Sequence, residues 1–260
     1  MRILVTFALE NEFAPWREMR KFRTDKWGQA QVLVTDIGGA EVGVILTGAG
    51  PRPAAAETSK VDWGESGKLE ICISTGLAGA LRPGYEIGQI LAASSVVSEA
   101  VHPELQGSTM ASSPAMISFA EECGATTVSA FCTTARVVTR PDEKRHLGTR
   151  ADAVEMESFE VLRRAASDGV PAAAIRAVSD TVDENLPPDM QEVFNDEGRV
   201  SIPRLVGHLA RHPGSVPNLM RFGKQASRAA ESLAEFLEKY IPVLAVKMKS
   251  LEVNSAASRS

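Results

Sequence analysis

The sequence has no apolar run long enough to cross a membrane, although 44% of its 260 residues are hydrophobic. Its opening, MRILVTFALENEF, turns acidic after nine residues, so we expect no amino-terminal targeting segment. Cysteine is scarce, and Cys72, Cys123 and Cys132 show no metal-binding spacing. These absences predict a soluble cytoplasmic protein with reduced thiols and without a structural zinc.

Acidic and basic residues are unevenly distributed along the chain. The formal net charge is −5, yet residues 201–260 carry nine Lys or Arg against four Glu, a balance of +5 that leaves −10 for residues 1–200. An acidic body is a poor partner for nucleic acid. The basic carboxyl-terminal segment is either a solvated helix face or a surface that contacts an anionic membrane peripherally.

Short apolar runs, several of them rich in Val and Ile, alternate with helix-like segments. The runs are RILVTFAL, QVLVTDI, VGVILTG, LEICISTG, IGQILAASSVV, TTVSAFCT and AAAIRAVSD. Helices are predicted over residues 51–63, 113–123, 141–147 and 152–168, and in two stretches after Ser201. This pattern predicts an α/β fold whose sheet is covered on both faces, with ligands at the carboxyl ends of the strands.

The length fits one domain as well as two, and we favour a single domain over residues 1–260. Residues 201–250 would form a helical carboxyl-terminal extension of that domain. Residues 185–218 contain five prolines and predict an irregular connection with one short helix, IPRLVGHLAR. We find no internal repeat.

Three carboxylates stand where burial is expected. Glu12 follows the first strand, Asp180 ends AAAIRAVSD, and Glu157 lies in VEMESFEVL. If residues 152–168 form one helix, Glu157 falls on its inward apolar stripe. Because an unpaired buried carboxylate costs on the order of several kcal/mol, either a partner such as Arg176 neutralises Glu157 or the stripe borders a polar cavity. Structural explanations also exist for the other two, a first-turn position for Glu12 and a cap for Asp180.

Two glycine-bearing turns, over residues 47–50 and 75–79, follow predicted strands. In the first turn, Gly48 and Gly50 precede a helix start at Pro51, so their N–H groups would bind an anion, with Arg52 beside them. Neither turn has the spacing of a dinucleotide-binding or P-loop fingerprint.

Four segments, in this order, resemble the purine and uridine phosphorylase superfamily, which includes the methylthioadenosine and S-adenosylhomocysteine nucleosidases. They are ALENE, STGLAGAL, AVEMES and IRAVSDTVDE, and the resemblance extends from Met1 to about Asp183. Beyond them, ENLPPDM, the segment from Asn195 to Phe222 and the closing helix look like the bacterial hopanoid-associated phosphorylases, thought to remove adenine from adenosylhopane. The resemblance implies a three-layer fold around a mixed, twisted sheet.

The resemblance also implies cleavage of the N-glycosidic bond of a 5′-modified adenine nucleoside, which builds positive charge on the sugar and negative charge on the base. Asp180 would donate a proton to purine N7, and Glu12 would deprotonate the attacking water. Glu157 would accept hydrogen bonds from the ribose hydroxyls, with Met156 against the sugar. The other implied substrate-binding residues are Glu155, Ser179, Leu77, Ala78, Gly79 and Val138. Neither a metal nor an organic cofactor is implied, and a homo-oligomer, by preference a dimer, is expected.

Two departures from the family pattern bear on the reaction. Phosphorolytic members typically place Arg-x-Gly-Ser or Arg-x-Gly-Thr where residues 74–77 read STGL. An Arg fork is the strong anchor for phosphate, so its absence favours water as the nucleophile unless Arg52 substitutes. Val137 and Val138 stand where nucleosidases usually carry an aromatic residue, so stacking on the base should be weaker.

Alternatives remain open at this level. They are hydrolysis of methylthioadenosine, S-adenosylhomocysteine or futalosine, purine nucleoside phosphorolysis with phosphate as second substrate, and a non-catalytic nucleoside-binding module. The presence of Glu12, Glu157 and Asp180 in one chain weighs against the binding module, because a binder needs no acid aimed at N7.

The last predicted helix carries an apolar stripe with two interpretations. The stripe either packs on the domain, or part of it lines a groove for a long 5′ substituent while a basic flank rests near anionic headgroups. Its residues are Leu219, Phe222, Ala226, Ala229, Leu233, Phe236 and Leu237, with Arg221, Lys224 and Arg228 lying off the stripe.

Overall fold

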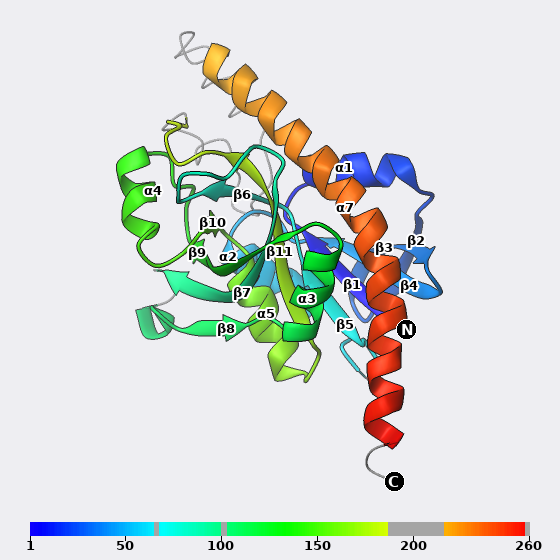
Figure 1. Ribbon diagram of the computed structural model, residues 1–260. Coiled ribbons are helices and arrows are strands. Elements are labelled where there is room, and N and C mark those ends of the chain that lie inside the picture. Colours follow the sequence, from blue (N-terminus) through cyan, green and yellow to red (C-terminus); the bar gives the residue numbers. More distant parts are fainter. Residues whose placement is uncertain (65–67, 100–102, 187–215, 258–260) are drawn as a thin grey trace.

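Strands and helices alternate in the computed structural model, which describes residues 1–64, 68–99, 103–186 and 216–257 (Figure 1). The strands are β1 (Arg2–Phe7), β2 (Arg23–Trp27), β3 (Ala30–Ile37), β4 (Ala40–Leu46), β5 (Ile71–Ser74), β6 (Leu77–Ala80), β7 (Ile90–Glu99), β8 (Thr109–Ala111), β9 (Thr126–Thr134), β10 (Ala153–Glu155) and β11 (Ala172–Asp180). The helices are α1 (Glu10–Met19), α2 (Pro51–Ser59), α3 (Pro114–Glu122), α4 (Pro141–Leu147), α5 (Ser158–Ser167) and α7 (Val216–Ala257), with a 3-10 turn at Pro103–Leu105.

The strands form one mixed sheet in the order β2-β3-β4-β1-β5-β11-β6-β10-β9-β7-β8. β1 pairs in parallel with β4 and β5, and β5 pairs in parallel with β11. β7 pairs with both β9 and β11, so β11, β6, β10, β9 and β7 close into a ring. This closure brings the ends of β9, β10 and β11 together.

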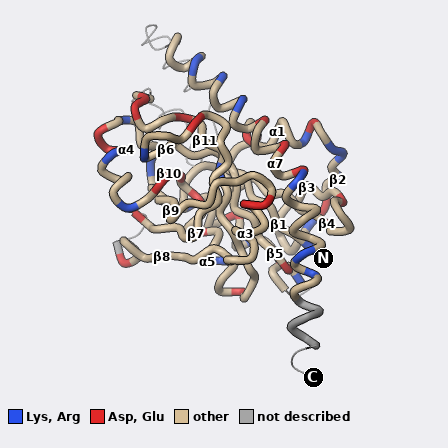
Figure 2. Tube along the Cα trace, viewed as in Figure 1, with Lys and Arg blue, Asp and Glu red and all other residues tan. Residues whose placement is uncertain are grey.

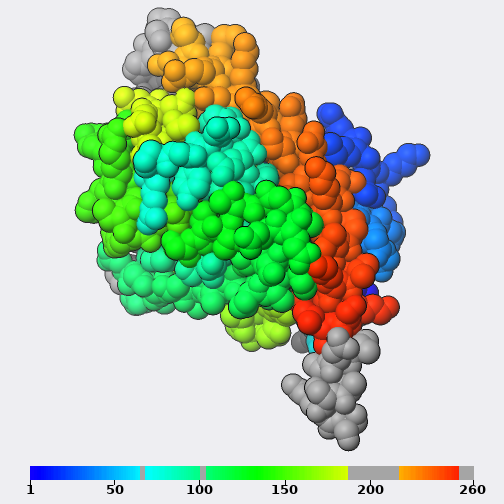
Figure 3. Space-filling model, viewed as in Figure 1, coloured from blue at the N-terminus to red at the C-terminus, as the bar shows by residue number. Residues whose placement is uncertain are grey.

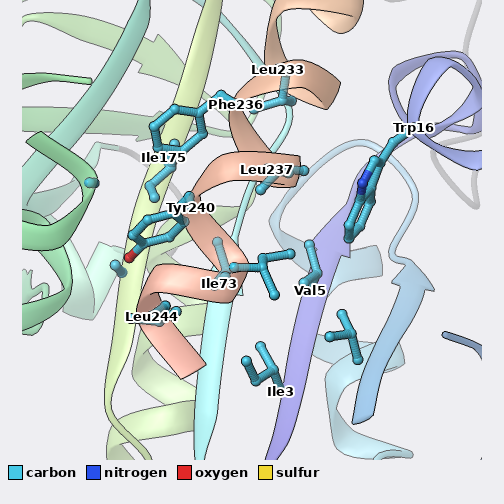
Figure 4. Close-up of a cluster of buried hydrophobic side chains, with 14 of the residues drawn as sticks. Ile3, Val5, Trp16, Ile73, Ile175, Leu233, Phe236, Leu237, Tyr240 and Leu244 are labelled. Carbon is cyan, nitrogen blue, oxygen red and sulfur yellow. The ribbon is translucent and has the colours of Figure 1, made fainter. Parts of the chain in front are cut away.

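Helices cover both faces of the sheet. α1, α3 and α7 pack on one face, where Leu233, Phe236 and Leu237 of α7 lie over the apolar side chains of β1, β5 and β11 (Figure 4). α2 and α5 cover the other face, with Phe159 and Leu162 in a second apolar cluster. The predicted three-layer α/β fold around a mixed sheet is therefore confirmed.

α7 has two portions with different surroundings. From Ala226 to Leu244 its apolar stripe is buried, and Tyr240 in that stretch donates a hydrogen bond to the carbonyl of Met116, 2.9 Å away. Before Ala226 the helix projects past the sheet, as the orange turns in Figures 1 and 3 show. Leu219 and Phe222 in that portion are half-buried. The predicted short helix IPRLVGHLAR lies outside the described residues.

The predicted helix over residues 152–168 is wrong at its beginning. Residues Ala153–Glu155 form β10, which pairs with β6 and β9, and α5 begins only at Ser158. A buried stretch of only three residues fits a helical stripe and a buried strand equally well, and strand pairing on both sides decides for the strand. Glu157 is consequently the N-cap residue of α5 and lies at a junction between two elements. β2, β6 and β8 were not predicted as separate strands.

Candidate active site

A cavity of about 340 Å³ opens where β1, β9, β10 and β11 end. Its lining includes Glu12, Glu157 and Asp180, the three carboxylates that the sequence singles out. Two sets of charged residues line or border it. We call Glu12, Glu155, Glu157 and Arg176 the glutamate end, and Asp180 with its partner Lys144 the aspartate end.

Glu12 lies in the first turn of α1, directly after β1, and is buried. Its Oε2 accepts hydrogen bonds from the N–H groups of Ala8 (2.9 Å) and Leu9 (3.1 Å), and its Oε1 accepts one from Leu77 N–H (3.1 Å). Burial raises the pKa of Glu12 above its ordinary value, although these hydrogen bonds and the Arg176 charge oppose the rise. A carboxylate with a raised pKa is suited to accept a proton.

Glu155 and Glu157 share one guanidinium. Arg176 Nη2 lies 2.6 Å from Glu155 Oε2 and 3.8 Å from Glu157 Oε2, so the cation considered as the partner of Glu157 pairs more closely with Glu155. Glu155 Oε2 also accepts the N–H groups of Glu157 (3.0 Å) and Ser158 (2.7 Å), and Glu155 Oε1 accepts the Thr133 hydroxyl. Glu155 is thus fully engaged in holding the junction between β10 and α5.

The glutamate end carries more negative than positive charge. Within the described residues, the positive charge near these three glutamates comes from Arg176. Burial, and next the charge of Glu155, raise the pKa of Glu157 to about 8. The cluster is therefore poised to hold a proton or to meet a ligand that is positively charged.

The N–H groups of Gly50 and Gly48, where an anion site was predicted, both have hydrogen-bond partners within the protein. Gly50 N–H donates to Glu157 Oε1 at 2.7 Å, and Gly48 N–H donates to the carbonyl of Ala8 at 2.9 Å. Glu157 thereby occupies the positive end of α2 itself. Arg52 is exposed and is not part of the cavity lining. The contact with Glu157 could not be predicted, because the carboxylate lies 107 residues away in the chain and reaches the turn only in the folded protein.

Asp180 ends β11 and is buried together with its partner. Lys144 Nζ lies 2.5 Å from Asp180 Oδ2, and the Ser179 hydroxyl donates to Asp180 Oδ1 at 2.7 Å. Lys144 was not predicted as a site residue, because it stands in the charged segment PDEKRHL, where a lysine is expected to be exposed. Its position three residues before the buried Leu147 was the one available signal.

Two glycines of the turn at residues 75–79 let the backbone approach the carboxylates. A Cβ on Gly79 would lie 2.8 Å from Asp180 Oδ2, and a Cβ on Gly76 would lie 3.0 Å from Glu12 Oε2. Gly76 also has a φ of +141°, which favours glycine. The backbone of this turn lies against both Asp180 and Glu12, and its Leu77 N–H donates a hydrogen bond to Glu12.

The remaining predicted substrate-binding residues also line the cavity; they are Met156, Ser179, Leu77, Ala78 and Val138. An apolar wall completes the cavity, and it includes three residues of the stripe predicted on the last helix. Leu186 follows β11, and Leu219, Phe222 and Ala226 come from the projecting portion of α7. In the described parts of the chain, no group of three His, Cys, Asp or Glu side chains is arranged to hold a metal ion. Within the same residues, no helix has both the length and the apolar character needed to span a bilayer.

The model of the phosphorylase superfamily matches residues 2–242 of this chain. The chain therefore belongs to the phosphorylase superfamily. Membership confirms the enzyme class expected from the sequence motifs, a nucleosidase or nucleoside phosphorylase. No curated protein matches the sequence significantly.

Solved structures share the fold at low sequence identity. A futalosine hydrolase mutant of Helicobacter pylori strain 26695 has a TM-score of 0.71 and 18% identity, covering 93% of this chain and 98% of that one. A mutant Helicobacter pylori nucleosidase with 5′-methylthioadenosine in the active site has a TM-score of 0.70 and 18% identity, covering 92% and 97%. The Campylobacter jejuni 5′-methylthioadenosine/S-adenosyl homocysteine nucleosidase has a TM-score of 0.69 and 18% identity, covering 93% and 99%.

Proposed function

We propose that the protein hydrolyses the N-glycosidic bond of an adenine nucleoside with an apolar 5′ substituent and releases adenine. The observation that carries the proposal is the meeting of Glu12, Glu157 and Asp180 in one cavity. One cavity with all three carboxyl groups can stabilise both the positive charge that develops on the sugar and the negative charge that develops on the base.

The two ends of the cavity have the electrostatic character that this reaction needs. As the C1′–N9 bond breaks, its electron pair moves to the purine and the sugar becomes cationic. Glu157 and Glu12 face the sugar, whose developing positive charge favours their ionised forms, and Glu157 accepts hydrogen bonds from the ribose hydroxyls. Asp180 delivers a proton to N7 of the departing base, and Glu12 takes a proton from the water that attacks C1′.

Water is the nucleophile we favour over phosphate. The N–H groups of Gly48 and Gly50 are already donated within the protein, and Glu157 occupies the helix terminus that an anion would use. A phosphate there would meet like charge from three glutamates. The absence of an arginine from residues 74–77 points the same way.

The apolar wall supports a substituent larger than the 5′-hydroxyl of adenosine. Leu186, Leu219 and Phe222 add apolar surface to a cavity that already holds the residues for base and sugar. An adenosylhopane-type substrate, which carries a large apolar group at the 5′ position, would use such a wall. Methylthioadenosine, the ligand in one similar structure, would use less of it.

The proposal includes two further features that the sequence suggests. One is a homodimer in the cytoplasm, which size-exclusion chromatography with light scattering would measure. The other is contact of the projecting portion of α7 with anionic membranes. Arg221 and Lys224 are exposed there beside the exposed Met220, Arg228 is exposed one turn further on, and the basic positions stand out on the upper turns in Figure 2. Co-sedimentation with anionic and neutral vesicles tests this contact, which predicts binding to the anionic vesicles alone.

The central experiment follows adenine release from adenosine, 5′-methylthioadenosine and a 5′-alkyl adenosine with a long chain, each with and without phosphate. We expect release in phosphate-free buffer, a free sugar product, and preference for the long-chain substrate. Strict dependence on phosphate with a sugar 1-phosphate product would overturn the hydrolytic proposal.

A substitution in the wall tests the 5′ preference. Deleting α7 is unsuitable, because its second portion is core. Phe222→Ala should lower kcat/KM for the long-chain substrate by about 10-fold, the scale of a lost apolar pocket contact, and leave adenosine turnover unchanged. Met220→Ala is the matched control, because Met220 is 61% exposed on the same helix. Equal losses on both substrates would mean that Phe222 contacts the base or sugar instead.

A further inference from the structure

Lys144 is a fully buried cation on a short surface helix. Its side chain is 0% exposed, whereas Asp142, Arg145 and His146 on the same helix are exposed. Burying an ammonium costs free energy unless strong partners compensate, so such a lysine requires a specific reason. Its acidic partner, Asp180, lies 36 residues away in the chain.

Every donor of the Lys144 ammonium is used. Nζ lies 2.5 Å from Asp180 Oδ2, 2.8 Å from the carbonyl of Thr181 and 3.2 Å from the carbonyl of Glu184. With Ser179 on Oδ1, both oxygens of Asp180 accept hydrogen bonds. The carboxylate is consequently held in one orientation, and its charge is compensated on the side next to α4.

The same turn connects the acid to the apolar wall. Glu184 Oε2 accepts the N–H of Thr181 at 2.9 Å, and Glu184 Oε1 accepts the side-chain amide of Gln225 on α7 at 2.7 Å. Leu186, two residues further on, lines the cavity. Lys144 therefore binds the turn through the carbonyls of Thr181 and Glu184, and it binds Asp180 through the Asp180 carboxylate.

We propose that Lys144 is a positioning residue for bond cleavage, holding Asp180 beside the departing base and stabilising the carboxylate that remains once the Asp180 carboxyl group has given its proton to that base. This inference rests on the proposed function, in which Asp180 serves as the acid. Lys144 transfers no proton to the substrate, and its contribution appears only in the step that Asp180 assists. Substitution of Lys144 should therefore slow the release of leaving groups that need protonation more than the release of those that do not.

The test compares two leaving groups in the same preparation of enzyme. Adenine needs protonation as it departs, whereas 4-nitrophenolate from 4-nitrophenyl β-D-ribofuranoside does not. Lys144→Met should lower kcat for adenine release by about 10²-fold with a small change in KM, the usual scale for general acid assistance. Nitrophenolate release should stay within about 3-fold, because it bypasses that assistance. The ratio of the two rates does not depend on the fraction of folded enzyme.

Two further variants sharpen the test. Lys144→Arg keeps the charge and should restore part of the adenine activity that Lys144→Met loses; if Lys144→Met does not fold, Lys144→Gln takes its place, keeping donors without the charge. Arg145→Met is the matched control, since Arg145 pairs with Asp183 of the same turn at 2.5 Å but the two side chains are 59% and 71% exposed. It should change neither rate.

The outcomes separate this inference from the proposed function. Equal losses on both leaving groups, or unchanged adenine release in Lys144→Met, would overturn the positioning role. Asp180→Asn is measured alongside. If Asp180→Asn loses adenine release and the lysine variants keep it, only the inference about Lys144 fails. If Asp180→Asn keeps full activity, the assignment of Asp180 as acid fails first.

Discussion

The two ends of the cavity manage buried charge in opposite ways. At the aspartate end, one carboxylate meets one ammonium at 2.5 Å, and a hydroxyl satisfies the second oxygen. At the glutamate end, Glu12, Glu155 and Glu157 share Arg176, which contacts Glu155 closely and Glu157 at 3.8 Å. One end is electrically balanced, and the other retains negative charge.

The difference matches the charges of glycosidic cleavage. Surplus negative charge beside a sugar stabilises a developing cation, whereas surplus negative charge beside a departing anion would oppose it. Balanced charge at the aspartate end avoids that penalty while keeping a carboxyl group near the base. Substitutions at each end should therefore fail in different ways.

Asp180→Asn should give the largest effect. Asn keeps the shape of Asp but cannot supply a carboxyl proton, so kcat for adenine release should fall by about 10²- to 10⁴-fold. Nucleoside binding, measured by calorimetry, should persist. Asp183→Asn serves as control, because Asp183 is exposed on the same turn. Adenine release near the wild-type rate would contradict the assigned role.

Arg176→Met should destabilise the fold rather than act on one step. It would leave three buried glutamates without their cation, and breaking a buried pair costs about 3–5 kcal/mol in the free energy of unfolding. Urea denaturation measures the loss. Arg17→Met provides the comparison, since the pair of Arg17 and Glu10 is exposed and such pairs contribute about 0–1 kcal/mol. Similar stabilities for the two variants would refute the shared-guanidinium account.

Glu12→Gln should lower kcat by about 10²-fold, because an amide cannot take a proton from water. Binding of substrate should change less than kcat, since Gln can still accept from the backbone N–H groups of Ala8 and Leu9 and loses only the hydrogen bond from Leu77 N–H. Glu10→Gln is the control, being exposed in the same helical turn. Single-turnover measurements of adenine release check both, and a change confined to KM would speak against a base.

The pH dependence of stability should give the smallest effect. Burial raises the pKa of Glu157 from 4.5 to about 8, so the folded protein binds more protons than the unfolded chain between these values. Stability from this group is then full below about pH 4.5 and is lost as pH rises toward 8. Thermal unfolding across this range should show the decline, and Glu157→Gln should flatten it. An unchanged slope in the variant would exclude Glu157 as the source.

Much of the fold could be predicted locally. The runs that became β1, β3, β4, β5, β7, β9 and β11 carry their apolar pattern within a few residues, and the helix over residues 141–147 has the predicted bounds. The error at residues 152–168 arose because a short apolar stretch has no period of its own and takes its structure from neighbouring strands. The stripe of α7 was read correctly as apolar, but its division into core and cavity wall depends on where the sheet ends.

The sequence by itself determined the superfamily, the α/β alternation and the three carboxylates, because motif order, apolar periodicity and residue type are properties of the chain. Tertiary structure decided their partners. Lys144 meets Asp180 across 36 residues, and Gly50 meets Glu157 across 107. The physical reason is that burial makes an unpaired charge costly, yet the packing of α4, α2 and β11 determines which oppositely charged or donating group lies within reach. The contrast between the balanced and the negative end of the cavity exists only in the folded protein.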